Sequence, residues 1–109
     1  MYTDDLRRFC LALPGTTESM PFGQDTLVFK VGGKMYALVD VETCASVNVK
    51  CEPERAVELR DRFEAVRPGY HMNKRHWNTI AFGADLSDRE VLHWVRHSYD
   101  LIVSSLPKR

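Results

Sequence analysis

"TLVFKVGGKMYALVDV", residues 26–41, is the stretch that decides the fold. Two runs rich in β-branched and aromatic residues flank the pair Gly32–Gly33. A glycine pair supplies the positive φ angles that a two-residue hairpin turn requires, so the stretch predicts a β-hairpin. "SVNVK", residues 46–50, alternates apolar and polar residues and predicts a third strand, which extends the hairpin into an antiparallel meander.

Helices are predicted before and after this meander along the chain. Residues 3–13 place their apolar side chains on one helical face, and a polar loop then runs to Asp25. Pro53 suits the first turn of a second helix, where its missing N–H costs nothing. Ser87 and Glu90 form a capping box, which predicts the start of a third helix.

Two more strands are expected between the second and third helices. "HWNTIAF", residues 76–82, has strand character, and we expect a short strand that ends near Val66 to precede it. The element order is then α-β-β-β-α-β-β-α. It indicates an α+β fold of two layers, with helices on one face of an antiparallel sheet.

Length and composition limit the class of protein. The chain has 109 residues, enough for a single domain over 1–109 with one core. The formal net charge is zero, which argues against a protein that coats nucleic acid through bulk charge. No apolar run approaches the roughly 20 residues that span a bilayer. "MYTDDLRRFC" lacks the basic start of a secretion signal, so we expect a cytoplasmic protein without membrane contact.

The cysteines and histidines predict no metal site and no cofactor. Three cysteines without a C-x-x-C spacing indicate neither a disulfide framework nor a zinc knuckle. Cys51, at a strand end before a helix, is expected to have some thiolate character. His93 and His97 are four residues apart on the last helix, but charged neighbours there indicate a solvated face.

No pattern in the sequence predicts catalysis, so we expect the protein not to be an enzyme. Neither a G-x-G-x-x-G nor a G-x-x-x-x-G-K-S/T motif occurs. An enzymatic function would need Cys44 or Cys51 in a cleft beside a histidine, with a group that orients the base.

A basic and aromatic segment, "PGYHMNKRHWN" at residues 68–78, is the strongest functional candidate. No Asp or Glu occurs from residue 65 to residue 84. Cations can neutralise phosphates, amides can hydrogen-bond phosphates or base edges, and aromatic rings can stack on bases. The candidate nucleic-acid-binding residues are Lys74, Arg75, Asn73, His71, His76, Trp77 and Asn78, with Lys30 and Lys34 beside the predicted hairpin turn as a second ridge. The alternative is that the segment is structural and that Trp77 faces the core.

Four blocks in order resemble the MmcQ/YjbR family of small bacterial proteins, from about Leu13 to the C-terminus. They are "LPGTTESMPFGQDTLVFKVGGKMYALV", "VNVKCEPERAVELR", "PGYHMNKRHWNTI" and "HSYDLIVSSLPKR". The resemblance implies an α+β fold similar to the frataxin/CyaY type, with hairpins compared to a double-wing DNA-binding motif. The family residues that this chain retains are Pro68, Gly69, Tyr70, His71, Asn73, Lys74, His76, Trp77 and Asn78, which have no established individual roles. Glu52 departs from the expected capping aspartate.

The leading hypothesis from the sequence is therefore a non-enzymatic DNA-binding domain of modest affinity with a regulatory role. The alternative is a protein-interaction or small-ligand-binding module in which residues 68–78 are structural. A protein partner, or a homodimer through a free edge strand, stays open at this point. A frataxin-like iron site is not expected, because Asp4 and Asp5 are the only acids of the first helix.

Overall fold

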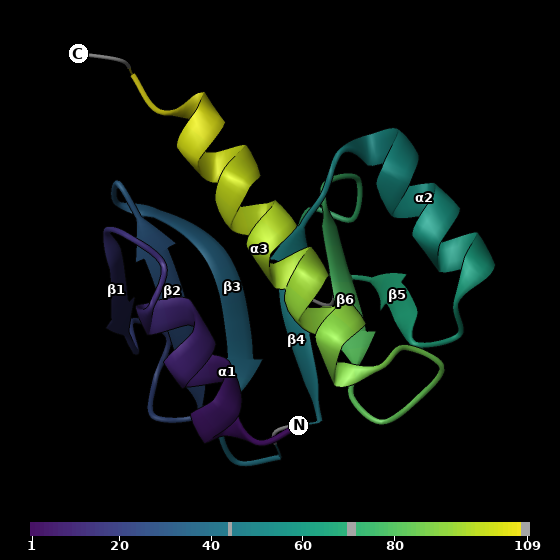
Figure 1. Ribbon diagram of the computed structural model, residues 1–109, viewed down its shortest axis with the longest axis horizontal. Coiled ribbons are helices and arrows are strands. Elements are labelled where there is room, and N and C mark those ends of the chain that lie inside the picture. Colours follow the sequence, from purple (N-terminus) through teal and green to yellow (C-terminus); the bar gives the residue numbers. More distant parts are fainter. Residues whose placement is uncertain (44, 70–71, 108–109) are drawn as a thin grey trace.

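The computed structural model describes residues 1–43, 45–69 and 72–107, and these form one sheet with three helices packed on it (Figure 1). The elements in chain order are α1 (Thr3–Leu11), β1 (Thr16–Ser19), β2 (Thr26–Val31), β3 (Lys34–Asp40), β4 (Ser46–Lys50), α2 (Pro53–Arg62), β5 (Val66–Pro68), β6 (Trp77–Ala81) and α3 (Asp88–Ser105). The sheet order is β1-β2-β3-β4-β6-β5, and every neighbouring pair is antiparallel. The predicted α+β class is confirmed.

The structure corrects the prediction in three places: it adds one strand, and it changes the limits of one helix and one strand. The loop expected before Asp25 contains β1, which pairs with β2 along Thr16–Ser19. β1 reads "TTES" and lies at the sheet edge, so it carries no apolar alternation that a pattern could detect. The first helix ends at Leu11 instead of residue 13. The short strand β5 begins at Val66, where the prediction had it end.

The meander that decides the fold forms as predicted. Gly32 and Gly33 have φ angles of 59° and 79°, the positive values that the tight turn between β2 and β3 requires. A Cβ added to Gly32 would lie 2.6 Å from the end of the Leu106 side chain, which would then have to move. The positive φ angles of the turn are therefore the main reason for the two glycines.

A β-bulge in β3 accounts for the deep burial of Tyr36. Phe29 pairs with Ala37 and Lys30 pairs with Met35, which leaves Tyr36 as the extra residue. Tyr36 and Ala37 consequently both enter the helix-covered core, and each has 0% of its surface exposed. The ring of Tyr36 packs edge-on against Tyr99 of α3, with 5.3 Å between the centroids.

Ser98 of α3 satisfies backbone groups where β3 and β4 separate beyond the bulge. Its hydroxyl donates a hydrogen bond to the Tyr36 carbonyl oxygen at 2.6 Å and accepts one from the Lys50 amide nitrogen at 2.9 Å. Ser98 has no exposed surface. This polar contact fixes the position of α3 on the sheet, because both backbone groups would otherwise be buried without a partner.

All three helices lie on one face of the sheet, as expected, and the other face carries none. Val47 and Val49 of β4 belong to the same buried cluster as Ala56 of α2 and Val91 of α3. Because side chains alternate along a strand, Ser46, Asn48 and Lys50 of β4 point to the opposite face. We call this the open face. Within the described residues, no helix is both long and apolar enough to cross a membrane.

Candidate functional site

Within the predicted segment 68–78, residues 73–76 form a turn before β6. The Asn73 side-chain oxygen Oδ1 accepts a hydrogen bond from the Arg75 amide at 2.9 Å, and the Asn73 carbonyl accepts one from the Trp77 amide at 2.9 Å. The Gly69 amide donates to the Trp77 carbonyl at 2.8 Å. The side-chain oxygen and the carbonyl oxygen of Asn73 thus both accept hydrogen bonds from the backbone of the turn. His71 lies outside the described residues.

Trp77 and Asn78 start β6 and face opposite sides of the sheet. Trp77 pairs with Lys50 and is half-buried, on the same face as Thr79, so it lies outside the helix-covered core. A Cβ on Gly69 would come within 2.8 Å of the Trp77 Cβ, which explains the glycine. Asn78 is 1% exposed and its amide nitrogen donates to the Ala56 carbonyl of α2 at 3.3 Å. Asn78 is therefore not part of an exposed surface.

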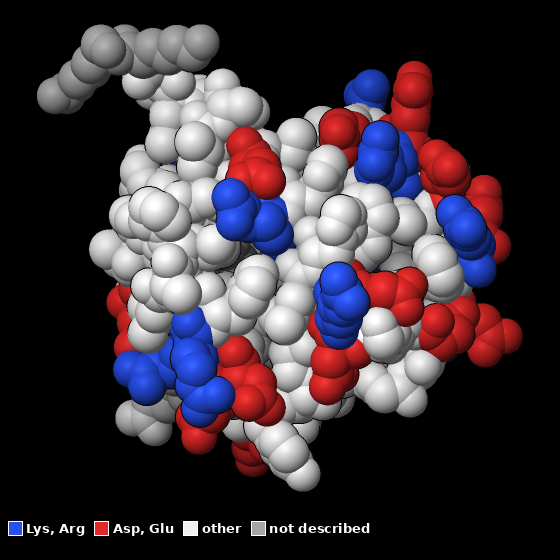
Figure 2. Space-filling model, viewed as in Figure 1, with Lys and Arg blue, Asp and Glu red and all other residues white. Residues whose placement is uncertain are grey.

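Three of the four predicted cations are exposed, but the four do not converge. Lys74 and Arg75 are exposed ahead of β6, while Lys34 is exposed at the β2–β3 turn and Lys30 is half-buried. Strands β2 and β6 are three positions apart in the sheet, which is roughly 14 Å at the usual strand spacing. Figure 2 shows that acidic and basic side chains also alternate over the helix-covered side of the molecule. The two pairs of cations therefore form separate ridges.

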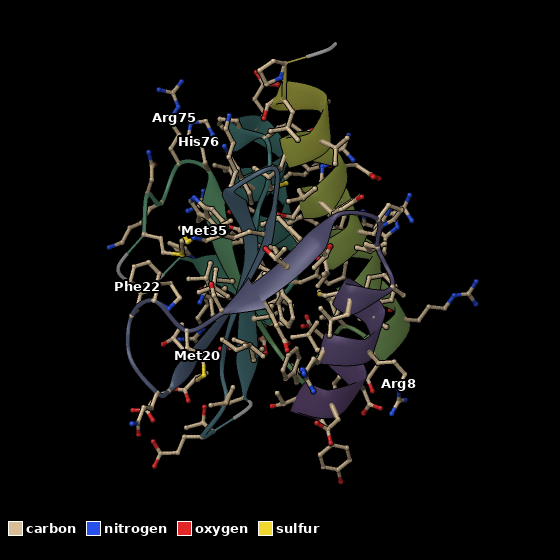
Figure 3. The ribbon with its side chains drawn as sticks, turned by 90° about the vertical axis from the view of Figure 1, so that its left-hand side faces the viewer. Arg8, Met20, Phe22, Met35, Arg75 and His76 are labelled. Carbon is tan, nitrogen blue, oxygen red and sulfur yellow. The ribbon has the colours of Figure 1, made fainter. Side chains whose placement is uncertain are left out.

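The open face carries a hollow of about 610 Å³ that the sequence did not predict. Its residues come from four neighbouring strands and from the segments that precede β2 and β6: Phe22, Thr26, Met35, Leu38, Val39, Asp40, Ser46, Asn48, Met72 and Thr79. Figure 3 shows Phe22 and Met35 close together on one side of the sheet, with Arg8 of α1 on the opposite side. The hollow is therefore separate from the helices.

Both polar and apolar side chains line this open-face pocket. The Thr79 hydroxyl donates a hydrogen bond to the Asn48 side-chain oxygen at 2.5 Å, across β4 and β6. The Asp40 carboxylate lies at the end of β3, where its Oδ1 accepts hydrogen bonds from two backbone amides of the following turn. Phe22 on the rim is 64% exposed, an unusual position for a large aromatic side chain with no folding role.

A second group of reactive side chains lies on the helix-covered side, at the junction of β4, α2 and α3. The His97 Nε2 is 2.6 Å from Glu52 Oε1, and the Cys51 Sγ is 3.7 Å from the same oxygen. One ligand atom from each of these three residues lies within 4.8 Å of the others. We call these three residues the Cys–Glu–His cluster.

The electrostatics of the Cys–Glu–His cluster correct one expectation. Burial, followed by the nearby Glu52 carboxylate, raises the pKa of Cys51 to about 11, so the predicted thiolate character is wrong. The hydrogen bond from His97 lowers the pKa of Glu52 below its usual value. Glu52 is the N-cap residue of α2, yet its side chain makes no capping bond and reaches α3 instead. This contact explains the departure from a capping aspartate.

Sequence reasoning missed both groups for identifiable reasons. It grouped His97 with His93, whereas the structure leaves His93 exposed and turns His97 toward Glu52, 45 positions away in the chain. For the open-face pocket a signal was present: Ser46 and Asn48 alternate with valines in β4, and Thr79 holds an equivalent position in β6. Polar residues at alternate positions of central strands predict an open sheet face.

Comparisons with known proteins agree on the family. The YjbR family profile matches residues 11–101. The uncharacterised protein YjbR of Escherichia coli strain K12 is 34% identical over 109 residues, with 99% of this chain and 92% of that protein covered. The uncharacterised protein YbdF of Escherichia coli O157:H7 is 33% identical over 104 residues, covering 94% of this chain and 85% of that protein.

Solved structures show the same fold. A crystal structure of a Deinococcus radiodurans protein with a DUF419 domain superimposes with a TM-score of 0.92 at 38% identity, covering 98% of this chain and 83% of that one. A crystal structure of a Pseudomonas syringae protein superimposes with a TM-score of 0.76 at 25% identity, covering 93% of this chain and 98% of that one. The profile match and the nearly full-length relatives lead to one conclusion: this chain is a member of the YjbR family.

Proposed function

We propose that the protein is a non-catalytic binding module for a small molecule, which binds in the open-face pocket. The observation that carries this proposal is a hollow of about 610 Å³ on the sheet that is lined by apolar side chains together with a few hydrogen-bonding groups. Pockets for small ligands typically measure roughly 300–1,000 Å³ and combine apolar walls with a few polar groups.

The polar lining residues indicate the class of ligand. Asp40 provides a carboxylate that accepts hydrogen bonds, and the Asn48 amide nitrogen can donate two. Thr79 donates to the Asn48 side-chain oxygen, and no described residue accepts a hydrogen bond from the Asn48 amide nitrogen, which is therefore the end that a ligand would meet. A ligand edge with both a donor and an acceptor would match this pair. The planar ring of Phe22 and the side chains of Met35 and Met72 suit a flat aromatic body.

These properties favour a neutral heterocycle such as a nucleobase over a phosphate-rich ligand. The Asp40 carboxylate in the lining would repel phosphate. Lys74 and Arg75 do not line the pocket. The segment 68–78 would then act mainly as scaffold, with Met72 as its contribution to the rim.

The test is a backbone amide NMR titration with adenosine and with guanosine. We expect shift changes confined to the pocket residues, and Phe22→Ala should weaken binding at least about fivefold because it removes a stacking ring worth about 1 kcal/mol or more. Tyr2→Ala is the matched control, since Tyr2 is also a highly exposed aromatic residue, at 78%, but lies at the N-terminus. Shift changes at Lys74 and Arg75 alone, or none with either nucleoside, would overturn the proposal.

DNA binding remains a second proposal, supported by one observation. Among the ion pairs between described residues, none involves Lys30, Lys34, Lys74 or Arg75, so these cations are available to phosphates. With about four phosphate contacts, binding should be weak and should decrease moderately with salt. Fluorescence anisotropy of a labelled 20-base-pair duplex tests this. Loss of binding in Lys74→Ala/Arg75→Ala supports the proposal, whereas no binding at low salt removes it.

A further inference from the structure

We propose that the Cys–Glu–His cluster is a binding site for a divalent transition metal of the zinc type, formed by Cys51 Sγ, Glu52 Oε1 and His97 Nε2. The site is separate from the open-face pocket and does not depend on the function proposed for that pocket. Thiolate, imidazole and carboxylate are the three side-chain ligands that zinc uses in proteins.

The three ligands are brought together by elements that are far apart in the chain. Cys51 follows the last residue of β4, Glu52 is the N-cap of α2, and His97 lies in the middle of α3. A tetrahedral zinc ion holds its nitrogen, oxygen and sulfur ligands roughly 3.3–3.6 Å apart. The Cys51–Glu52 distance of 3.7 Å is close to this range, and the Glu52–His97 distance of 2.6 Å is shorter than it by less than one ångström. The Cys51 and His97 ligand atoms lie within 4.8 Å of each other.

The surroundings hold two of the ligands in place. The His97 ring packs edge-on against Trp94, with 5.2 Å between the centroids, which restricts its rotation. Cys51 is 2% exposed, and its amide donates to the His76 carbonyl at 2.7 Å. Metal ligands in proteins are typically oriented by such supporting contacts. The side chains of His97 and Glu52 are partly exposed, at 22% and 44%, so solvent can reach the cluster.

Two neighbouring groups must be considered with the site. Arg55 Nε lies 4.0 Å from the Glu52 carboxylate, a long and exposed ion pair that contributes little and that a metal ion would displace. The buried Asn78 Oδ1 has no hydrogen-bond partner among the described residues. Asn78 contacts Ala56, whose amide donates to the Glu52 carbonyl.

The ligand set also indicates which metals fit. A single carboxylate and no other oxygen ligand are too few for Ca²⁺ or Mg²⁺, which prefer oxygen throughout. The thiol favours zinc and similar first-row ions, with the Cys51 proton released to solvent on binding. Because the ligands join β4, α2 and α3, a bound ion would tie the two helices to the sheet. We therefore expect binding to raise the unfolding temperature.

The test uses the full chain, freed of metal with a chelator, and Zn²⁺ and Co²⁺ as the probes. We expect Zn²⁺ to raise the melting temperature by several degrees and to saturate at one equivalent. Co²⁺ should give the near-ultraviolet absorption of a thiolate–cobalt bond and the visible absorption of a four-coordinate ion. Cys51→Ser should remove the near-ultraviolet band, and His97→Gln should weaken Co²⁺ binding by more than about tenfold.

Matched controls separate this site from other histidines and thiols. His93 lies one turn earlier on α3, at an exposed position. His93→Gln should therefore leave both the Zn²⁺-dependent melting shift and the Co²⁺ absorption unchanged. Cys44→Ser, whose position lies outside the described residues, should also leave them unchanged. Melting curves of each variant without metal verify that it folds. No Zn²⁺-dependent shift in the wild type, or a thiolate–cobalt band that persists in Cys51→Ser, would overturn the proposal.

Discussion

The two faces of the sheet are built on different principles. On the helix-covered face, Tyr36, Val47 and Ile80 have no exposed surface, and their packing defines the fold. On the open face, side chains from the same strands line a hollow that contains the Thr79–Asn48 hydrogen bond. Neighbouring residues of one strand therefore serve separate purposes. Stability should depend on the first face, and recognition of a ligand on the second.

The largest expected effect comes from a pair of substitutions, one on each face. Ile80→Ala removes a fully buried side chain of β6 and should lower the free energy of unfolding by about 2–5 kcal/mol. Met35→Ala, on the rim of the open-face pocket, should cost about 1 kcal/mol. Urea denaturation measures the free energy of unfolding of both variants, and the comparison holds if their m-values are equal to that of the wild type. An equal loss in the two variants would mean that the open face belongs to the folding core.

A smaller effect is expected for the polar contact between α3 and the sheet. Ser98→Ala leaves the Tyr36 carbonyl and the Lys50 amide without partners and should cost about 1–3 kcal/mol. Ser104→Ala, on the exposed side of the same helix, is the control and should change stability by less than about 0.5 kcal/mol. If both substitutions are neutral, water replaces Ser98 and the contact does not position α3.

Acid stability should depend on the segment that follows α2. The Asp85 carboxylate accepts hydrogen bonds from the amides of Ala65 and Glu64, each at 2.8 Å, and these lower the pKa of Asp85. The unfolded chain, with an aspartate pKa of about 3.9, then binds a proton more readily than the folded one. This contribution to stability is present above that pKa and is lost as the pH falls through the lower folded value.

Asp85→Asn should therefore make stability less dependent on pH in the acid range. Urea midpoints measured between about pH 5 and pH 2.5 should fall less steeply in this variant than in the wild type. Asp61→Asn, an exposed aspartate on α2, is the matched control and should follow the wild-type curve. Parallel curves for Asp85→Asn and the wild type would show that the two amide contacts do not persist in solution.

The sequence predicted the helix-covered face far better than the open one. Hairpin glycines, the capping box at Ser87 and the Pro53 helix start are local signals, and each appears in the structure as predicted. β1 was missed because an edge strand of polar residues is defined by its pairing with β2 alone. Local patterns could not reveal that pairing.

The candidate sites were harder to predict for a related reason. Glu52 and His97 are 45 positions apart, and only the packing of α2 and α3 brings them together. The residues of segment 68–78 were predicted to bind nucleic acid because they are basic, amide-bearing or aromatic. Much of their polarity serves the turn and the start of β6, as Asn73 and Asn78 show. Residue type predicted a binding surface, but burial and hydrogen bonding decide which of those residues remain available.

The smallest effects are expected within this segment, and they separate its scaffold from its surface. Asn73→Ala removes the acceptor for the Arg75 amide and should cost about 0.5–1.5 kcal/mol. Lys74→Ala/Arg75→Ala should change the unfolding free energy by less than about 0.5 kcal/mol, because both side chains are exposed. Thermal or urea unfolding measures both. A loss of stability in the double variant would show that Lys74 and Arg75 contribute to the folded structure. They would then not be available as a binding surface of this segment.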